Sequence, residues 1–258
     1  MGSASREALA KVVKLLDGPV AEAAGSELLS AAEELRSNQQ LSAALIDNAA
    51  SVADKATLVS RVFGGFSGSA RSVLIEATGE RWSNAAEFAA GIEELGIRAV
   101  AATDRDLSDE LIAVANVVDS SHDLELNLGS KLADPTAKTA AAKQLFGNKV
   151  SAGALTVVTH LVSNPAGGRL SPALREAARV AADQTGATLA TVTAAAPLDA
   201  ERLERLGRAL TRIAGRQVKI STIIDPTLVG GLRVQIADEI IDGSVSARLD
   251  DLRLQLAG

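Results

Sequence analysis

The sequence predicts a mainly α-helical protein with a small α+β module at its carboxyl end. Two observations predict the helical part: one segment of the chain is repeated without a gap, and in both copies apolar residues recur at spacings of three and four. After Gly186 the apolar residues instead alternate with a period of two, which predicts strands. We therefore expect two tandem helical bundles followed by a strand-helix-strand-strand-helix domain. The expected domains are residues 1–96, 97–186 and 187–258.

The repeat is clearest where residues 27–45 are set over residues 110–128. At this offset of 83 residues, Glu, Leu, Ser and several further apolar positions agree. The same offset pairs Lys55 with Lys138, Phe63 with Phe146 and Leu74 with Val157. The second copy then carries an insertion, SNPAGGRLSP. Agreement over such a length indicates a duplicated helical domain.

Each copy is expected to hold five or six short helices. Ser26 and Ser67 are the expected N-caps of two of them, because each is followed by apolar residues at helical spacing. Pro135, directly after Asp134, fits the first turn of another helix. The expected helix breaks lie at residues 37–38, 64–65 and 83–84 and at Gly96.

The carboxyl-terminal module begins with the alternating run ATLATVTAAAP, which predicts a strand. Asp199 is the expected cap of the helix that follows. The apolar face of this helix carries Leu203, Leu206, Leu210 and Ile213. The runs QVKISTIID and GLRVQIAD predict two further strands, and a DGS step ends the last strand. Apolar residues from Val245 to Leu256 predict a final helix.

Composition limits the kind of protein that the chain can be. Of its 258 residues 47% are hydrophobic but only 2% are aromatic, so the cores must be built mostly from Ala, Leu, Val and Ile. The absence of cysteine excludes disulfides and thiolate metal sites. No apolar run approaches the roughly 20 residues of a membrane span. We therefore expect a cytoplasmic protein that reaches a membrane only through its partners.

The net charge of −6 is unevenly distributed. Residues 187–258 hold 9 basic and 9 acidic residues, so the 17 basic and 23 acidic residues before them carry the whole excess. An acidic helical region argues against binding to nucleic acid, whose phosphates require a basic face. A partner that brings a basic or amphipathic helix would be better matched.

The familiar signatures of catalytic and nucleotide-binding sites are absent from the sequence. His122 and His160 lie in the repeated region without evident metal partners, which favours surface or packing roles for both. The arginines between Arg202 and Arg216 are interleaved with Glu and lack aromatic neighbours. This pattern favours a solvated helix face over a stripe that binds nucleic acid.

Four acidic residues cluster near the carboxyl end, namely Asp225, Asp238, Glu239 and Asp242. They could form an acid/base pair or a divalent-cation site. The alternative, which we favour, is turn and cap chemistry, because Asp225 precedes Pro226 and Asp242 precedes Gly243. The Gly230-Gly231 pair likewise fits a bend or a close backbone approach better than a phosphate cradle.

The same residues resemble a known family. The stretches TVTAAAPLDAERLERLGRAL and IDPTLVGGLRVQIADEIIDGSVSARLDDLRLQL are similar to the carboxyl-terminal signature of the delta subunit of bacterial F-type ATP synthase. They are also similar to the mitochondrial oligomycin sensitivity-conferring protein. The D-P-x-L-x-G-G and I-D-G-S-x-x-x-R-L elements are specific to this signature. The helical region resembles the helical domain of the family more weakly.

The resemblance implies a non-catalytic subunit of the peripheral stalk, without a cofactor or metal, at the cytoplasmic face of the bacterial plasma membrane. In that family the helical domain binds the amino-terminal helix of an alpha subunit at the crown of the catalytic head, and the module joins the carboxyl end of the b subunits. The positions that match the signature, and are expected to shape the surface for b, are Asp225, Gly230, Gly231, Asp242, Gly243 and Arg248. As residues of the groove for the alpha helix we nominate Leu9, Val12, Val73 and Leu74 of the first copy.

The chain departs from the family in one respect, because typical members have a single helical domain and this chain has two. Such longer chains resemble those of high-GC Gram-positive bacteria. We expect the extra copy either to bind a second alpha helix or to brace the b subunit. Two other classes of protein stay open as alternatives. One is a stand-alone helical adaptor that binds amphipathic helices, and the other is an enzyme that uses the carboxylates around Asp238.

Overall fold

The structure is a computed structural model that describes the chain except residues 131, 165–168, 229, 237–238 and 243–258. The first seven helices are α1 (Ser3–Val12), the 3-10 helix η1 (Val13–Asp17), α2 (Ala24–Ser37), α3 (Gln39–Ile46), α4 (Val52–Val62), α5 (Gly68–Gly79) and α6 (Ala85–Thr103). They are followed by α7 (Leu107–Asp119), α8 (His122–Gly129), α9 (Pro135–Phe146), α10 (Ala152–Ser163) and α11 (Leu170–Gln184). None of the helices in the described ranges is long and apolar enough to cross a membrane.

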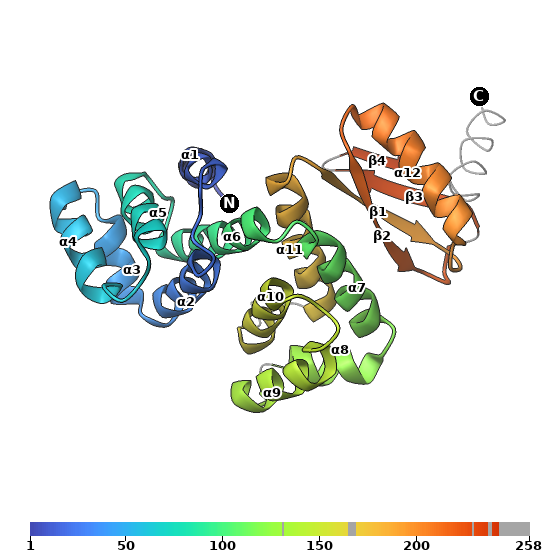
Figure 1. The fold of residues 1–258 in the computed structure, drawn as a ribbon, viewed down its shortest axis with the longest axis horizontal. Helices are drawn as coiled ribbons and strands as arrows, with labels where there is room; N and C mark the ends of the chain where they lie inside the picture. The colour runs from blue at the N-terminus through green and yellow to red at the C-terminus, as the bar shows by residue number, and fades with distance from the viewer. Residues whose placement is uncertain (131, 165–168, 229, 237–238, 243–258) are drawn as a thin grey trace, which may run out of the picture.

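The repeat in the sequence is also a repeat in the fold (Figure 1). The offset of 83 residues carries Ala24, the first residue of α2, onto Leu107, the first residue of α7. The helix α2 packs along α6 in the first copy, and α7 packs along α11 in the second. The predicted duplication of a helical domain is therefore visible as two similar bundles.

A buried acid-to-cap contact is duplicated as well. The carboxylate of Glu27 accepts hydrogen bonds of 2.9 and 3.0 Å from the backbone N–H of Ser67, the N-cap of α5. In the second copy, the carboxylate of Glu110 accepts hydrogen bonds of 3.1 and 3.0 Å from the N–H of Ser151, the N-cap of α10. In both copies this contact attaches the first turn of one helix to the start of another.

The helix α6 is shared by the two copies. Its residue Phe88 belongs to the hydrophobic core of the first bundle, whereas its residue Ile97 belongs to the core of the second. The predicted break at Gly96 is wrong, because α6 continues through this residue to Thr103. A glycine is required there because a Cβ would lie 3.0 Å from the backbone nitrogen of Leu29 on α2. The expected boundary between residues 96 and 97 thus falls inside a helix.

Most of the predicted helix starts are confirmed. Ser67 and Asp199 accept hydrogen bonds from the backbone N–H three residues ahead, and Pro135 lies in the first turn of α9. The predicted cap at Ser26 is wrong, because α2 begins at residue 24 and the hydroxyl of Ser26 donates to the carbonyl of Ala23. The turn before α2 is already helical, so the chain needs no cap at Ser26.

The module contains a four-stranded mixed sheet in the order β2-β1-β3-β4. Its elements are β1 (Thr188–Ala194), α12 (Ala200–Ala214), β2 (Val218–Ile224), β3 (Leu232–Ile236) and β4 (Glu239–Asp242). β1 and β2 are parallel, with α12 as the crossover, and β3 is antiparallel to both β1 and β4. The predicted fold class of helical bundles with a small α+β module is confirmed.

One detail of the module differs from the prediction. The last predicted strand is followed by a further strand, since the chain reverses between Ile236 and Glu239, which pair across β3 and β4. No Gly or Pro marks this reversal in the sequence, so the alternation gave no sign of it. The predicted final helix from Val245 to Leu256 lies outside the described residues.

Candidate partner-binding surfaces

Asp225 closes the turn that follows β2. Its Oδ1 accepts hydrogen bonds from the hydroxyl of Thr227 at 2.6 Å and from the N–H of the same residue at 3.0 Å. These two hydrogen bonds hold the pKa of Asp225 below its usual value. The backbone N–H of Asp225 donates to the carbonyl of Ala194 at 2.9 Å, which attaches the turn to β1. In the structure this carboxylate is thus a turn-forming group.

Gly230 and Gly231 lead the chain from this turn into β3. Their φ angles of 89° and 83° lie in the left-handed region, which residues with a Cβ rarely adopt. The pair therefore permits a bend that other residues would strain. Asp242 is the last residue of β4. The signature positions Gly243 and Arg248 lie outside the described residues.

The acidic cluster near the carboxyl end was the basis for the enzyme alternative. Asp238 itself lies outside the described residues, and Glu239 belongs to β4. Where the structure describes the chain, it contains no group of three or more His, Asp or Glu residues that could hold a metal ion.

The four residues nominated for a groove in the first copy lie in its interior. Leu9, Val12, Val73 and Leu74 are each at most 9% exposed and belong to one hydrophobic core. Their apolar spacing marked a buried helix face, which in the sequence looks the same as an open one. A role for them in binding a partner stays a prediction.

An open apolar cleft of about 460 Å³ lies in the second copy, between α6, α10 and α11. Its larger apolar side chains are Ile97, Leu161, Leu170, Pro172 and Val180. Its charged lining residues are Glu93, Glu94, Glu176 and Arg169. The cleft therefore combines an apolar surface with more carboxylates than cations.

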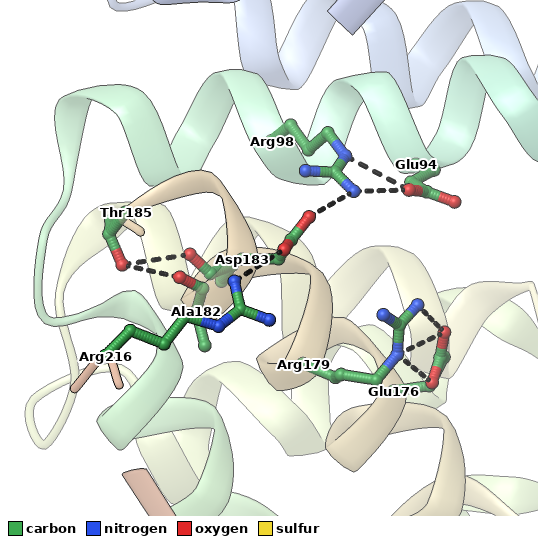
Figure 2. A network of polar contacts seen from close by, with 9 residues as sticks. Glu94, Arg98, Glu176, Arg179, Ala182, Asp183, Thr185 and Arg216 are labelled. Carbon is green, nitrogen blue, oxygen red and sulfur yellow. Dashed lines mark hydrogen bonds and ion pairs between the residues drawn. The ribbon is translucent and has the colours of Figure 1, made fainter. Parts of the chain in front are cut away.

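The cations that pair with these carboxylates are not among the residues that line the cleft. Glu94 pairs with Arg98 at 2.8 Å, and Glu176 pairs with Arg179 at 2.6 Å (Figure 2). These ion pairs hold the carboxylates in place beside the cleft. The sequence analysis missed this site, because it lies between helices that are far apart along the chain.

A signal for the cleft was nevertheless present in the repeat. The offset of 83 residues pairs Glu94 with Lys11 and Ile97 with Lys14. In the first copy, Nζ of Lys11 lies 2.7 Å from a carboxylate oxygen of Glu80, so a salt bridge occupies the surface between α1 and the end of α5. The two copies thus differ in charge and hydrophobicity at equivalent positions.

Comparison with known proteins gives a consistent result. The model of the family described as ATP synthase delta (OSCP) subunit matches residues 98–256. The ATP synthase subunit delta of Leifsonia xyli subsp. xyli is 44% identical over the full length of both chains. That of Corynebacterium diphtheriae is 36% identical, also over both full lengths, and that of Streptomyces avermitilis is 32% identical over 98% of each chain.

One solved structure shows a weaker similarity. A chain of the Toxoplasma gondii mitochondrial ATP synthase hexamer is 21% identical, with a TM-score of 0.36, and covers 63% of this chain and 97% of its own.

The family match and the full-length relatives define the class as a structural, non-catalytic subunit of an ATP synthase. The chain belongs to the ATP synthase delta (OSCP) subunit family. The matched range contains the second helical copy and the module and leaves out nearly all of the first copy. The region typical of the family is therefore the part of the chain that holds the apolar cleft.

Proposed function

We propose that this chain is a stator subunit of the peripheral stalk, which links alpha subunits at the crown of the catalytic head to the b-subunit stalk. In this role it prevents the head from turning with the rotor, so that proton-driven rotation is coupled to ATP synthesis. Its membership of the delta (OSCP) family supports the proposal. The proposed location is the cytoplasmic face of the bacterial plasma membrane, where the chain is held through the complex alone.

The observation that carries the proposal is the cleft of the second copy. An apolar surface beside Glu94 and Glu176 suits an amphipathic helix that has basic residues along one edge. The equivalent surface of the first copy bears Lys11 and Lys14, which would repel such a helix. We therefore assign the alpha-subunit helix to residues 97–186 together with α6.

The other parts of the chain receive complementary roles. In this proposal the first copy, residues 1–96, braces the assembly rather than binding a helix of its own. The module, residues 187–258, binds the carboxyl end of the b subunits. The surface for b is shaped by the signature positions Asp225, Gly230, Gly231, Asp242, Gly243 and Arg248.

The test is a calorimetric titration of the full chain with a synthetic peptide of the alpha subunit's amino-terminal helix. We expect one binding site. Ala173→Arg places a long cation in the cleft and is expected to weaken binding about tenfold or more, a loss of at least about 1.4 kcal/mol. Ala10→Arg on the exposed face of α1 is the matched control and should leave the affinity unchanged.

Two results would contradict the proposal. Absence of binding to the full chain would remove the proposed contact with an alpha subunit. Two sites, neither of them weakened by Ala173→Arg, would show that the helix binds elsewhere than in the cleft.

A further inference from the structure

Asp183, near the end of α11, lies between two arginines that come from different parts of the fold (Figure 2). Its Oδ2 is 3.0 Å from Nη2 of Arg98, and its Oδ1 is 3.6 Å from Nη1 of Arg216. Arg98 belongs to α6, whereas Arg216 lies in the connection from α12 to β2. A single carboxylate therefore bridges the helical part and the module.

The burial of Arg98 makes this bridge more than a surface contact. The side chain of Arg98 is only 9% exposed, and its guanidinium is held by Glu94 as well as by Asp183. A buried cation that loses one of its partners costs far more than a solvated one. Without Asp183, moreover, the guanidinium groups of Arg98 and Arg216 would lose the anion that lies between them.

The strand β2 makes two further polar contacts with the helices. Nζ of Lys219 lies 2.8 Å from Oδ2 of Asp109 on α7, and the Lys219 side chain is only 11% exposed. Oγ of Ser221 lies 3.2 Å from Nε of Arg175 on α11. Lys219 and Ser221 are two positions apart, so they lie on the same face of β2. This face of the strand is thus bound to both α7 and α11.

The hydrophobic core also crosses the junction. Ala187 and Leu189, at the start of the module, are buried in the core of the second bundle rather than in that of the sheet. The sheet has a separate small core with α12, which contains Val192, Leu210 and Val234. Polar contacts therefore surround an apolar seam that joins β1 to the helices.

We propose that the second bundle and the module form one rigid body, locked by the Asp183 bridge and by the Lys219–Asp109 pair. Force applied to the module is then transmitted to α6 and is not absorbed by bending at residues 185–187. Because α6 belongs to both hydrophobic cores, the same path reaches the first bundle. This property does not depend on which partners bind at either end of the chain.

The test uses spin labels, which are easy to place because the chain has no cysteine. One pair of labels spans the junction, on the exposed residues Ala113 of α7 and Ala209 of α12. The reference pair, Ala113 with the exposed Ala140 of α9, stays within the second bundle. We expect narrow distance distributions for both pairs in the full chain, as measured by pulsed electron paramagnetic resonance.

The double variant Asp109→Asn/Asp183→Asn should broaden the distribution across the junction and leave the reference pair narrow. Glu201→Gln/Glu204→Gln removes the same charge from two exposed ion pairs of α12 and should broaden neither distribution.

A broad junction distribution in the unaltered chain would overturn the proposal, and so would a double variant without broadening. If the reference pair also broadens in the double variant, Arg216→Gln/Asp109→Asn decides by the same criterion, because both of its positions are largely exposed.

Discussion

Nε2 of His160 lies 2.8 Å from Oε1 of Glu93, which joins α10 to α6. The other oxygen of Glu93 accepts a hydrogen bond of 2.8 Å from Arg36 at the end of α2. Burial alone would raise the pKa of Glu93, but the hydrogen bond from His160 and the charge of Arg36 outweigh it, and the pKa is lowered. One ionised carboxylate therefore connects the first bundle to the second.

Glu93→Gln is expected to lower the free energy of unfolding by about 1–3 kcal/mol at neutral pH, because hydrogen bonds to a charged group are lost. The folded-state pKa of Glu93 lies below its ordinary value of 4.5, so this stabilisation is complete above that pH and is lost as the pH falls through the folded-state pKa. Urea denaturation at about pH 7 and about pH 4 measures both effects. Glu33→Gln, on the exposed face of α2, is the control. A deficit that stays constant in acid would argue against this role of Glu93.

Gly96→Ala should destabilise the chain by about 1–3 kcal/mol, since the packing of α2 against α6 leaves no room for a methyl group. A Cβ there would lie 2.9 Å from Cγ of Leu29 and 3.0 Å from its backbone nitrogen. Gly79→Ala in α5 meets nothing within 4 Å and should stabilise by about 0.4–1 kcal/mol. Thermal denaturation of the two variants measures the contrast. Equal effects would mean that the helices can separate without cost.

Gly231→Ala should destabilise the sheet by about 1 kcal/mol or more, because its φ of 83° is strained for any residue with a Cβ. Hydrogen exchange of the β3 amides should accelerate, while that of α2 stays unchanged. Gly207→Ala is the control within the module, since its Cβ would make only an ordinary contact of 3.5 Å with Ile220. This control should slow exchange or leave it unaltered. Unchanged exchange in β3 of the Gly231 variant would contradict the prediction.

Glu27→Gln and Glu110→Gln are each expected to cost about 0.5–2 kcal/mol, because each removes the charge that accepts from a helix cap. The two contacts lie in different bundles, so the double variant should be additive within about 0.5 kcal/mol. A double-mutant cycle in urea measures the coupling. A larger coupling energy would show that α6 transmits the loss of one contact to the other.

Features encoded by neighbouring residues could be predicted from the sequence. The helix starts at Ser67 and Asp199 depend on a side chain and a backbone amide three residues away, and both were found. Gly96 could not be interpreted, because its role depends on Leu29, which is distant in the sequence. The reversal after Ile236 was missed because the residues of the turn carry no Gly or Pro.

The partner-binding surface was the least predictable feature. A helical stripe of apolar residues tells which face is buried or bound, but not which of the two applies. Val12 and Val73 lie in a closed core, whereas Ile97 lies in the core and also lines an open cleft. The deciding information was the difference between the copies, in which Lys14 stands opposite Ile97 in the alignment.

The sharing of α6 sets the angular register between the two bundles. Each residue of an α-helix turns it by about 100° and advances it by about 1.5 Å. Insertion of a single residue near Gly96 would therefore swing one bundle around the helix axis by more than a quarter turn. A flexible linker would tolerate such an insertion, whereas here the length of one helix determines in which direction each bundle faces.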